Sequence, residues 1–217
     1  MKKHDENEFG SRVGYRQIID EIPRGSRVLD LGCGDGMLLD VLKRLKNAET
    51  FGVEISQEGV SQCLEKGLYC FQGDIDSGLA DYRADSFDYV ILNQTLQDTK
   101  KPEYVLCETM RIGKRAIVSF PNFGHVGIRV KLLTGGTMPR NRLFPYMWYE
   151  TPNIHLLTIR DFQEFCIMYG YPIGKESHFS MQRGRPVPVR AFPNFRAEYG
   201  FFVLDGDRYK ERRECNA

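Results

Sequence analysis

The chain has 217 residues, of which 41% are hydrophobic and 27% are charged, a composition typical of a single soluble globular domain. The net charge of +1 gives no bulk electrostatic reason to expect a nucleic acid as partner. The charged N-terminal residues contain no apolar signal segment, and no apolar run approaches the roughly 20 residues that cross a bilayer. We therefore expect one cytoplasmic domain over residues 1–217, with small molecules rather than nucleic acid or a membrane as partners.

Helix-type and strand-type patterns alternate over the first 120 residues. After a helix at 15–22, strands are expected at 27–31, 50–55, 68–72, 87–92 and 115–120. The helices between them are expected at 36–46, 57–65 and 102–111. Strands that alternate with helices at this spacing indicate βαβ units with right-handed crossovers and a parallel sheet.

The second half of the chain is less regular. Helices are expected at 124–133 and 158–168, and two further strands at about 172–180 and 199–204. Residues 183–188 are predicted to form a loop between these strands. The charged tail from Asp207 is predicted to fray.

Residues 134–153 are too long and irregular for a simple connection, and such segments are usually functional or disordered. This segment holds four large aromatic residues, Phe144, Tyr146, Trp148 and Tyr149. We therefore expect a packed cap rather than disorder. Tyr146, Trp148 and Tyr149 are assigned to a substrate pocket under this cap.

The most informative stretch is Asp30-x-Gly32-x-Gly34-x-Gly36, which follows an apolar strand and precedes a helix. Glycine permits positive φ and close approach of a ligand, and the helix start offers unpaired N–H groups. The turn is therefore predicted to bind a nucleotide-like ligand at the carboxyl edge of the sheet. Cys33 lies inside the turn and is predicted to be a small side chain beside that ligand.

Acidic residues near the turn favour S-adenosylmethionine over a dinucleotide. The glycine spacing is G-x-G-x-G rather than G-x-G-x-x-G. Asp30 and Asp35 flank the turn, where carboxylates would repel a pyrophosphate and attract a cation. Glu54 ends the next strand, where an acid can accept hydrogen bonds from both ribose hydroxyls.

Further residues complete the predicted cofactor site. Asp74 follows the third strand and can accept a hydrogen bond from the adenine amino group. Ile55 and Ile75 can pack on the adenine ring. Asn93, at the end of the fourth strand, is assigned to the same site.

No residue stands out as a catalyst, and the catalytic residues stay unknown. Gln94 and Gln97 follow the fourth strand and Asn122 follows the fifth, where neutral amides can orient a substrate but are poor bases. His125 and His155 are the candidate general bases, because histidine transfers protons near neutral pH. A structural role is the commoner one for each of them.

Six cysteines are spread over the whole chain, and none forms a CxxC pair. A zinc site needs clustered ligands, and disulfides are rare in cytosolic proteins, so we expect free thiols and no metal site. The cysteines are Cys33, Cys63, Cys70, Cys107, Cys166 and Cys215.

The glycine turn, Glu54 and Gly73-Asp74 together resemble the class I S-adenosylmethionine-dependent methyltransferases over residues 25–205. The resemblance implies the α/β, Rossmann-like class I methyltransferase fold. Its seven-stranded, mostly parallel sheet has the order 3-2-1-4-5-7-6, with the last strand antiparallel and helices on both faces. It also implies S-adenosylmethionine as cofactor, with S-adenosylhomocysteine as its product. Residues 93–97 lack the Asp/Asn-Pro-Pro-aromatic run of the nucleic-acid amino-methyltransferases.

Three longer runs, 73–79, 119–125 and 149–155, are similar to the methionine biosynthesis protein MetW family, as is most of 20–180. This resemblance implies a partner of homoserine O-acyltransferase in the homoserine-to-methionine route. It implies no methyl acceptor, so an active methyltransferase acting on an unidentified small molecule is the alternative. The cap at 134–153 is then either the interface for the acyltransferase or a lid over its own pocket.

Overall fold

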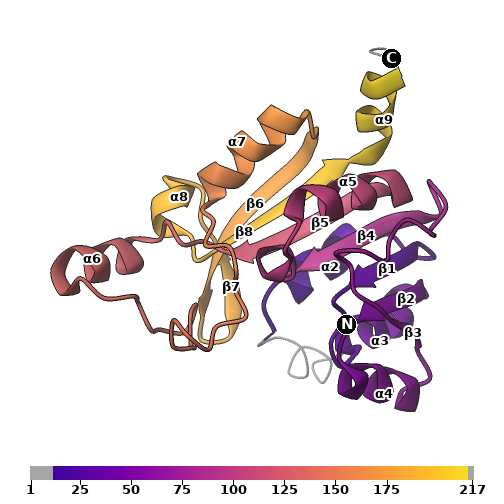
Figure 1. Ribbon diagram of the computed structural model, residues 1–217, viewed down its shortest axis with the longest axis horizontal. Helices are drawn as coiled ribbons and strands as arrows, with labels where there is room; N and C mark the ends of the chain where they lie inside the picture. Colours follow the sequence, from indigo (N-terminus) through magenta and orange to yellow (C-terminus); the bar gives the residue numbers. More distant parts are fainter. Residues whose placement is uncertain (1–11, 215–217) are drawn as a thin grey trace.

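The computed structural model describes residues 12–214, which form one mixed sheet covered by helices on both faces (Figure 1). The strand order is β3-β2-β1-β4-β5-β8-β6-β7. The five strands β1 to β5 are parallel, whereas β8 is antiparallel to both β5 and β6. The strands are β1 (Arg27–Leu31), β2 (Glu49–Glu54), β3 (Tyr69–Gln72), β4 (Phe87–Asn93), β5 (Gly113–Pro121), β6 (Ile173–Gln182), β7 (Arg185–Pro188) and β8 (Tyr199–Asp205).

The edge hairpin corrects two predictions. Residues 183–188 were expected to be a loop, but β7 pairs antiparallel with the end of β6. Arg183 and Gly184 between the two strands have φ values of 49° and 76°, as a two-residue hairpin turn requires. The prolines in β7 indicate a loop when read in the sequence, yet an edge strand tolerates proline because one of its sides needs no donor. The sheet therefore has eight strands instead of seven, and the order of the other seven agrees with the prediction.

The helices follow the predicted rhythm up to α7, and their ends differ from the predicted ones by a few residues. Within residues 12–214, no helix is long and apolar enough to cross a membrane. The helices are α2 (Tyr15–Glu21), α3 (Met37–Lys46), α4 (Gln57–Glu65), the 3-10 helix η1 (Leu96–Asp98), α5 (Pro102–Ile112), α6 (Val126–Gly135), α7 (Ile159–Tyr169), α8 (Pro193–Arg196) and α9 (Gly206–Glu214).

The segment after β8 is a helix, so the prediction of a frayed tail is wrong for residues 207–214, whereas residues 215–217, with Cys215, lie outside the described part of the chain. Tyr209 of α9 is buried, and its ring centroid lies 5.0 Å from that of Tyr171. Lys210 Nζ donates a hydrogen bond to the carbonyl oxygen of Gly113 at 3.2 Å. A single buried aromatic residue in a charged segment gives no periodic signal, so only the tertiary contacts reveal this helix.

The sheet is buried on both faces, because successive side chains of its central strands enter two different cores. In β1, Leu29 belongs to the core that α5 and α7 cover, and Val28 to the core that α2 and α3 cover. Strands buried on both faces have continuous apolar runs, which is the pattern that predicted them. On the α7 side, the rings of Phe120, Phe162 and Phe202 pack with centroid distances between 4.7 and 5.8 Å.

The predicted cap is packed near its middle and mostly exposed towards both ends. Leu143 and Phe144 are buried, and the Phe144 ring meets Phe123 edge to face at 5.5 Å. The prediction of a packed cap is therefore correct only for this part. The exposed aromatic side chains are Tyr146, Trp148 and Tyr149, at 52%, 73% and 65%.

Candidate functional site

The turn between β1 and α3 requires glycine at three positions, as the sequence predicted. The φ values are 80° at Gly32, 55° at Gly34 and 73° at Gly36, a region that side chains other than glycine rarely adopt. A Cβ on Gly32 would also lie 2.7 Å from Cγ2 of Thr95, in the segment after β4. The ends of β1 and β4 can therefore approach each other closely.

Glu54, the last residue of β2, fixes this turn. Its Oε2 accepts a hydrogen bond from the N–H of Gly34, and its Oε1 accepts one from the N–H of Ser56, both at 2.8 Å. An ionised carboxylate has about four acceptor positions, so two remain for a ligand. Glu54 can thus hold the turn and still accept hydrogen bonds from a ligand.

A cavity of about 140 Å³ lies beside the turn, at the carboxyl ends of β1, β2 and β3. Open α/β sheets bind ligands at this edge. Five of the predicted cofactor residues line it, namely Gly32, Glu54, Ile55, Asp74 and Ile75. The lining is completed by Val53, Gly73, Asp76, Thr95, Asp98 and Thr99.

Asp74 and Ile55 have local features that bear on ligand binding. Oδ1 of Asp74 accepts a hydrogen bond from the N–H of Asp76 at 2.9 Å, so this acid also shapes the turn after β3. The side chain of Ile55 is 65% exposed beside the cavity. An exposed apolar side chain next to hydrogen-bond acceptors is suited to a flat ring with polar edges.

The two acids that flank the turn differ, and neither lines the cavity. Asp30 is buried in β1, and this burial, together with the charge of Glu54, raises its pKa to about 7. Asp35 forms an ion pair of 2.8 Å with Arg12 and accepts a hydrogen bond from the N–H of Met37 at 3.2 Å. Burial raises the pKa of Asp35, but the Met37 hydrogen bond and the Arg12 charge outweigh it, leaving the pKa below its usual value. The Asp35 carboxylate is therefore already compensated by the protein.

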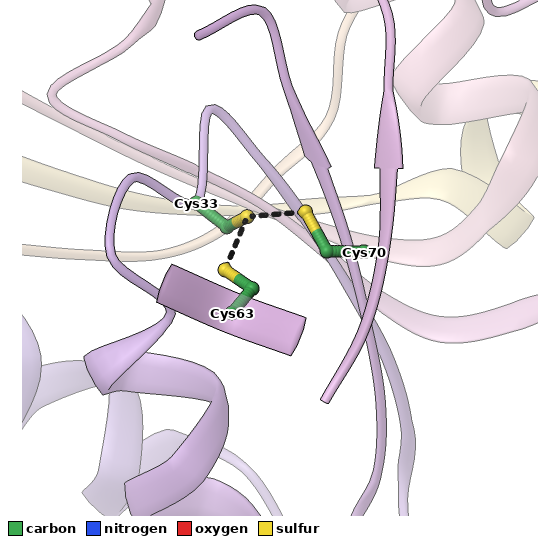
Figure 2. Close-up of side chains that lie close together, drawn as sticks. All are labelled: Cys33, Cys63 and Cys70. Carbon is green, nitrogen blue, oxygen red and sulfur yellow. Dashed lines mark hydrogen bonds between the residues drawn. The ribbon is translucent and has the colours of Figure 1, made fainter. Parts of the chain in front are cut away.

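Cys33 was assigned to the cofactor site, but its side chain does not line the cavity. Its Sγ faces Cys63 and Cys70 beneath the turn (Figure 2). The sequence separations of 30 and 37 residues gave no sign of this contact.

Asn93 also lies outside the cavity lining. Its Oδ1 accepts a hydrogen bond from the Ser119 hydroxyl at 2.6 Å, and its Nδ2 donates to the carbonyl of Val13 at 3.3 Å. These bonds connect the end of β4 with β5 and with the segment before α2. The side chain positions these three elements.

A larger cavity of about 530 Å³ adjoins the first, and Asp98 lines both. The predicted substrate residues Gln94, Gln97 and Tyr146 line it as well. Oε1 of Gln97 and Oδ1 of Asp98 are buried and have no hydrogen-bond partner within residues 12–214. Burial raises the pKa of Asp98 to about 6. Both oxygens are closed to solvent, so a ligand in the cavity could donate to them only after the two side chains rotate.

Two charged residues that the sequence did not indicate, Asp98 and Arg142, also line this cavity. Asp98 directly follows Gln97 in η1. Its position shortly after β4 could have indicated that it lines this cavity. Arg142 lies in the cap, and its Nη2 donates to the carbonyl of Met181 and to Oε2 of Glu198, both at 2.7 Å. The position of Arg142 depends on the contact between the cap and β6, which no local pattern reveals.

The other predicted substrate residues lie elsewhere. Asn122 is fully buried, its Nδ2 donates to the carbonyl of Ala197 at 2.8 Å, and its Oδ1 accepts from the N–H of Gly124 at 3.0 Å. It is part of the scaffold after β5 and lines neither cavity. Trp148 lines a further hollow of about 360 Å³, which shares Tyr146 and Asn153 with the 530 Å³ cavity, and Tyr149 meets the Trp148 ring edge to face at 5.5 Å.

Both histidines proposed as bases have a structural position. Nδ1 of His125 accepts a hydrogen bond from the N–H of Gly127 at 3.1 Å and caps the start of α6. His155 is exposed, and its backbone N–H donates to the carbonyl of Gln97 at 2.9 Å. Neither residue lines the 140 Å³ or the 530 Å³ cavity.

Several solved structures with this architecture are named as S-adenosylmethionine-dependent methyltransferases. The chain is similar to one from Thermotoga maritima, with 16% identity, a TM-score of 0.66 and coverage of 94% of both chains. It is also similar to one from Archaeoglobus fulgidus, with 13% identity, a TM-score of 0.62 and coverage of 94% of this chain and 99% of that chain. The protein therefore has the Rossmann-like fold of this class, as the sequence predicted.

The family profile of the methionine biosynthesis protein MetW matches residues 12–204, and the chain belongs to this family. It is 34% identical over 195 residues to the bifunctional methionine biosynthesis protein MetXA/MetW of Rhodopirellula baltica. That match covers 86% of this chain but 31% of the relative, so the chain spans about a third of the relative's length. The predicted link with methionine biosynthesis is confirmed.

Proposed function

We propose that the protein binds S-adenosylmethionine at the glycine turn and acts together with homoserine O-acyltransferase in methionine biosynthesis. The observation that carries the cofactor part is the cavity of about 140 Å³, where Glu54 and Asp74 offer carboxylate oxygens beside Ile55 and Ile75. In this proposal Glu54 accepts hydrogen bonds from the ribose hydroxyls. Asp74 accepts one from the adenine amino group, and the two isoleucines flank the ring.

The residues present fit this cofactor better than they fit a dinucleotide. Glu54 keeps free acceptor positions, and the buried Asp30 behind the turn disfavours a second negative charge. A pyrophosphate would add two charges beside these acids, whereas S-adenosylmethionine carries a sulfonium and an ammonium group. Titration calorimetry with S-adenosylmethionine and with NAD tests this part. Binding of NAD alone, or of neither ligand, would contradict it.

The partner part of the proposal is supported by the relative whose single chain is named for both MetXA and MetW. Proteins fused in one species often associate as separate chains in another, and here MetXA is taken as the homoserine O-acyltransferase. The exposed side of the cap is the interface that we propose. It offers Trp148 and Tyr149 with the exposed Met147 and Ile154, a composition typical of binding hot spots.

Co-purification and an acyl-transfer assay test the partner part. We expect a complex between the full-length chain and the acyltransferase of the same organism, and a change in the rate of acyl transfer to homoserine. If the two proteins elute separately and the rate is unaffected at a tenfold excess of this chain, the partnership is wrong. The cofactor part of the proposal can still hold in that case.

A methyltransferase acting on a small molecule is the second candidate, and the shared position of Asp98 favours it. Asp98 lines both cavities, so a molecule in the larger one would lie next to a cofactor in the smaller one. In this candidate the side chains of Gln97 and Asp98 rotate, and their unpartnered oxygens accept hydrogen bonds from the amine or hydroxyl group of the methyl acceptor. Formation of S-adenosylhomocysteine with a metabolite extract tests this candidate. If no product forms while a known methyltransferase is active in parallel, it fails.

The proposal includes the cytoplasmic location that the sequence predicted. Cys33, Cys63 and Cys70 lie close together as thiols, and such thiols persist best in a reducing compartment.

A further inference from the structure

Three cysteines from separate parts of the chain meet beneath the glycine turn (Figure 2). Cys33 lies in the turn itself, Cys63 in α4 and Cys70 in β3. The Sγ atom of Cys33 lies 3.8 Å from that of Cys63 and 3.6 Å from that of Cys70. All three sulfur atoms lie within 4.8 Å of one another.

Glycines create the space in which two of these sulfur atoms lie. A Cβ on Gly52 of β2 would lie 2.5 Å from the Sγ of Cys33. A Cβ on Gly36 would lie 2.6 Å from the Sγ of Cys63. A larger residue at Gly52 or Gly36 would therefore fill the space in which the Sγ of Cys33 or of Cys63 lies.

Two of the three thiols lie in apolar surroundings, and Cys70 is partly buried beside them. Cys33 and Cys63 are buried and form a small core of their own with Leu39 and Leu68. The carbonyl oxygen of Gly34 accepts from the Sγ of Cys63 at 3.4 Å.

We propose that Cys33, Cys63 and Cys70 bind one soft metal ion, Zn²⁺ or Cu⁺, through their three sulfur atoms. A metal–sulfur distance of about 2.3 Å places two tetrahedral sulfur ligands about 3.8 Å apart, and trigonal ones about 4.0 Å apart. The measured separations of 3.6 and 3.8 Å need little rearrangement. Thiolate ligands select these soft ions over Mg²⁺ or Ca²⁺.

Binding at this site changes no oxidation state. Each coordinating thiol loses its proton to solvent, so one S–H bond breaks for every metal–sulfur bond that forms. Cu⁺ accepts three sulfur ligands without a fourth group. Zn²⁺ would take a fourth ligand, for which the carbonyl oxygen of Gly34, 3.4 Å from the Sγ of Cys63, is one candidate.

A metal here would connect the glycine turn with α4 and β3. The inference does not rest on the proposed function, because it needs no cofactor and no acyltransferase. The bound metal would stabilise the turn in addition to the hydrogen bond from the Gly34 N–H to Glu54.

The test is metal binding by the full-length chain after treatment with a chelator and a phosphine reductant under argon. Zn²⁺ and Cu⁺ are titrated separately against chromophoric competitors, and Co²⁺ is added as a spectroscopic probe. We expect one equivalent to bind, with a thiolate-to-cobalt charge-transfer band and a higher melting temperature. Each single variant, Cys33→Ala, Cys63→Ala and Cys70→Ala, is expected to lose at least tenfold in affinity. Cys166→Ala, which removes a buried thiol of α7, is the matched control and is expected to bind as the wild type does.

Two results would overturn the inference. One is a folded wild-type chain, verified by circular dichroism, that binds neither Zn²⁺ nor Cu⁺ more tightly than the triple alanine variant does. The other is equal loss of affinity in Cys166→Ala and in the three cluster variants. Because Cys70 is only partly buried, Cys70→Ala is the variant expected to fold best, and it keeps the test informative if the other two unfold.

Discussion

The Glu54 carboxylate accepts a 2.8 Å hydrogen bond from the backbone N–H of Gly34, which joins the end of β2 to the middle of the glycine turn. The acid therefore has two roles, one in holding the turn and one in offering oxygens to the 140 Å³ cavity. Both roles depend on the acceptor oxygens of the carboxylate, so a substitution that removes one of these acceptors affects the turn and the cavity together.

Glu54→Gln is expected to weaken binding of S-adenosylmethionine at least tenfold, which is about 1.4 kcal/mol. The amide keeps one acceptor oxygen but places donors where the ribose hydroxyls would donate, and it removes the negative charge. Titration calorimetry measures the change. Glu65→Gln, at an exposed position at the end of α4, is the control and should bind as the wild type does. Equal affinities of the wild type and Glu54→Gln would refute this role of Glu54.

Gly36→Ala is expected to destabilise the protein by about 2–4 kcal/mol, since backbone strain adds to overpacking. The backbone has φ of 73°, and the new Cβ would lie 2.6 Å from the Sγ of Cys63. Gly67→Ala is a matched control with φ of 67° and nothing within 4 Å of its Cβ, so it should lose only about 1 kcal/mol. Urea unfolding measures both free energies. If the two variants are equally stable, the close approach of the new Cβ at position 36 to the Sγ of Cys63 does not destabilise the protein.

The Asp98 carboxyl is expected to make the protein less stable as the pH rises from about 4 to 7. Burial raises its folded-state pKa to about 6, whereas the unfolded value is about 3.9. Protonated Asp98 is thus preferred in the folded state, and this contribution is lost as the pH rises through the folded pKa. Asp30 changes stability in the same direction, because its pKa is also raised, to about 7.

The contribution of Asp98 is isolated by comparison of the wild type with Asp98→Asn. Urea unfolding between pH 4 and 7 is expected to give a smaller loss of stability in the variant. The exposed Asp81→Asn should follow the wild type. If the free energies of unfolding of the wild type and of Asp98→Asn fall by the same amount between pH 4 and 7, burial does not disfavour the ionised form of Asp98.

Trp148→Ala is expected to weaken the complex with homoserine O-acyltransferase at least tenfold without changing the stability of the free chain. Its side chain is 73% exposed, so few contacts within the chain are lost, whereas aromatic anchors dominate interfaces. Surface plasmon resonance measures the affinity. Ile167→Ala, which is 78% exposed on α7, is the control for loss of an apolar surface residue. Unchanged affinity in Trp148→Ala would move the interface away from the cap.

S-adenosylmethionine is expected to change the affinity between this chain and the acyltransferase, which would couple the pathway to a product of methionine. Coupling between two sites must be reciprocal in binding free energy. The affinity for the acyltransferase with the cofactor present, and the affinity for the cofactor with the acyltransferase present, should therefore shift by the same factor. Identical binding curves with and without the cofactor would exclude such coupling.

The amino-acid sequence by itself determined the elements whose signal is local. β1 and β4 were predicted because a strand buried on both faces is a continuous apolar run. The turn at Gly32, Gly34 and Gly36 was predicted because only glycine adopts its positive φ readily. The place of Glu54 beside it followed from the parallel order of β1 and β2, whose carboxyl ends meet at one edge.

Only the tertiary structure decided the features that join residues far apart in the chain. The sulfur atoms of Cys33 and Cys70 lie 3.6 Å apart across 37 residues, and Asp98 reaches two cavities at once. The edge strand β7 and the helix α9 likewise depend on partners that their own residues do not indicate. Register and crossover set these distances, and both result from packing of the whole sheet rather than from local preference.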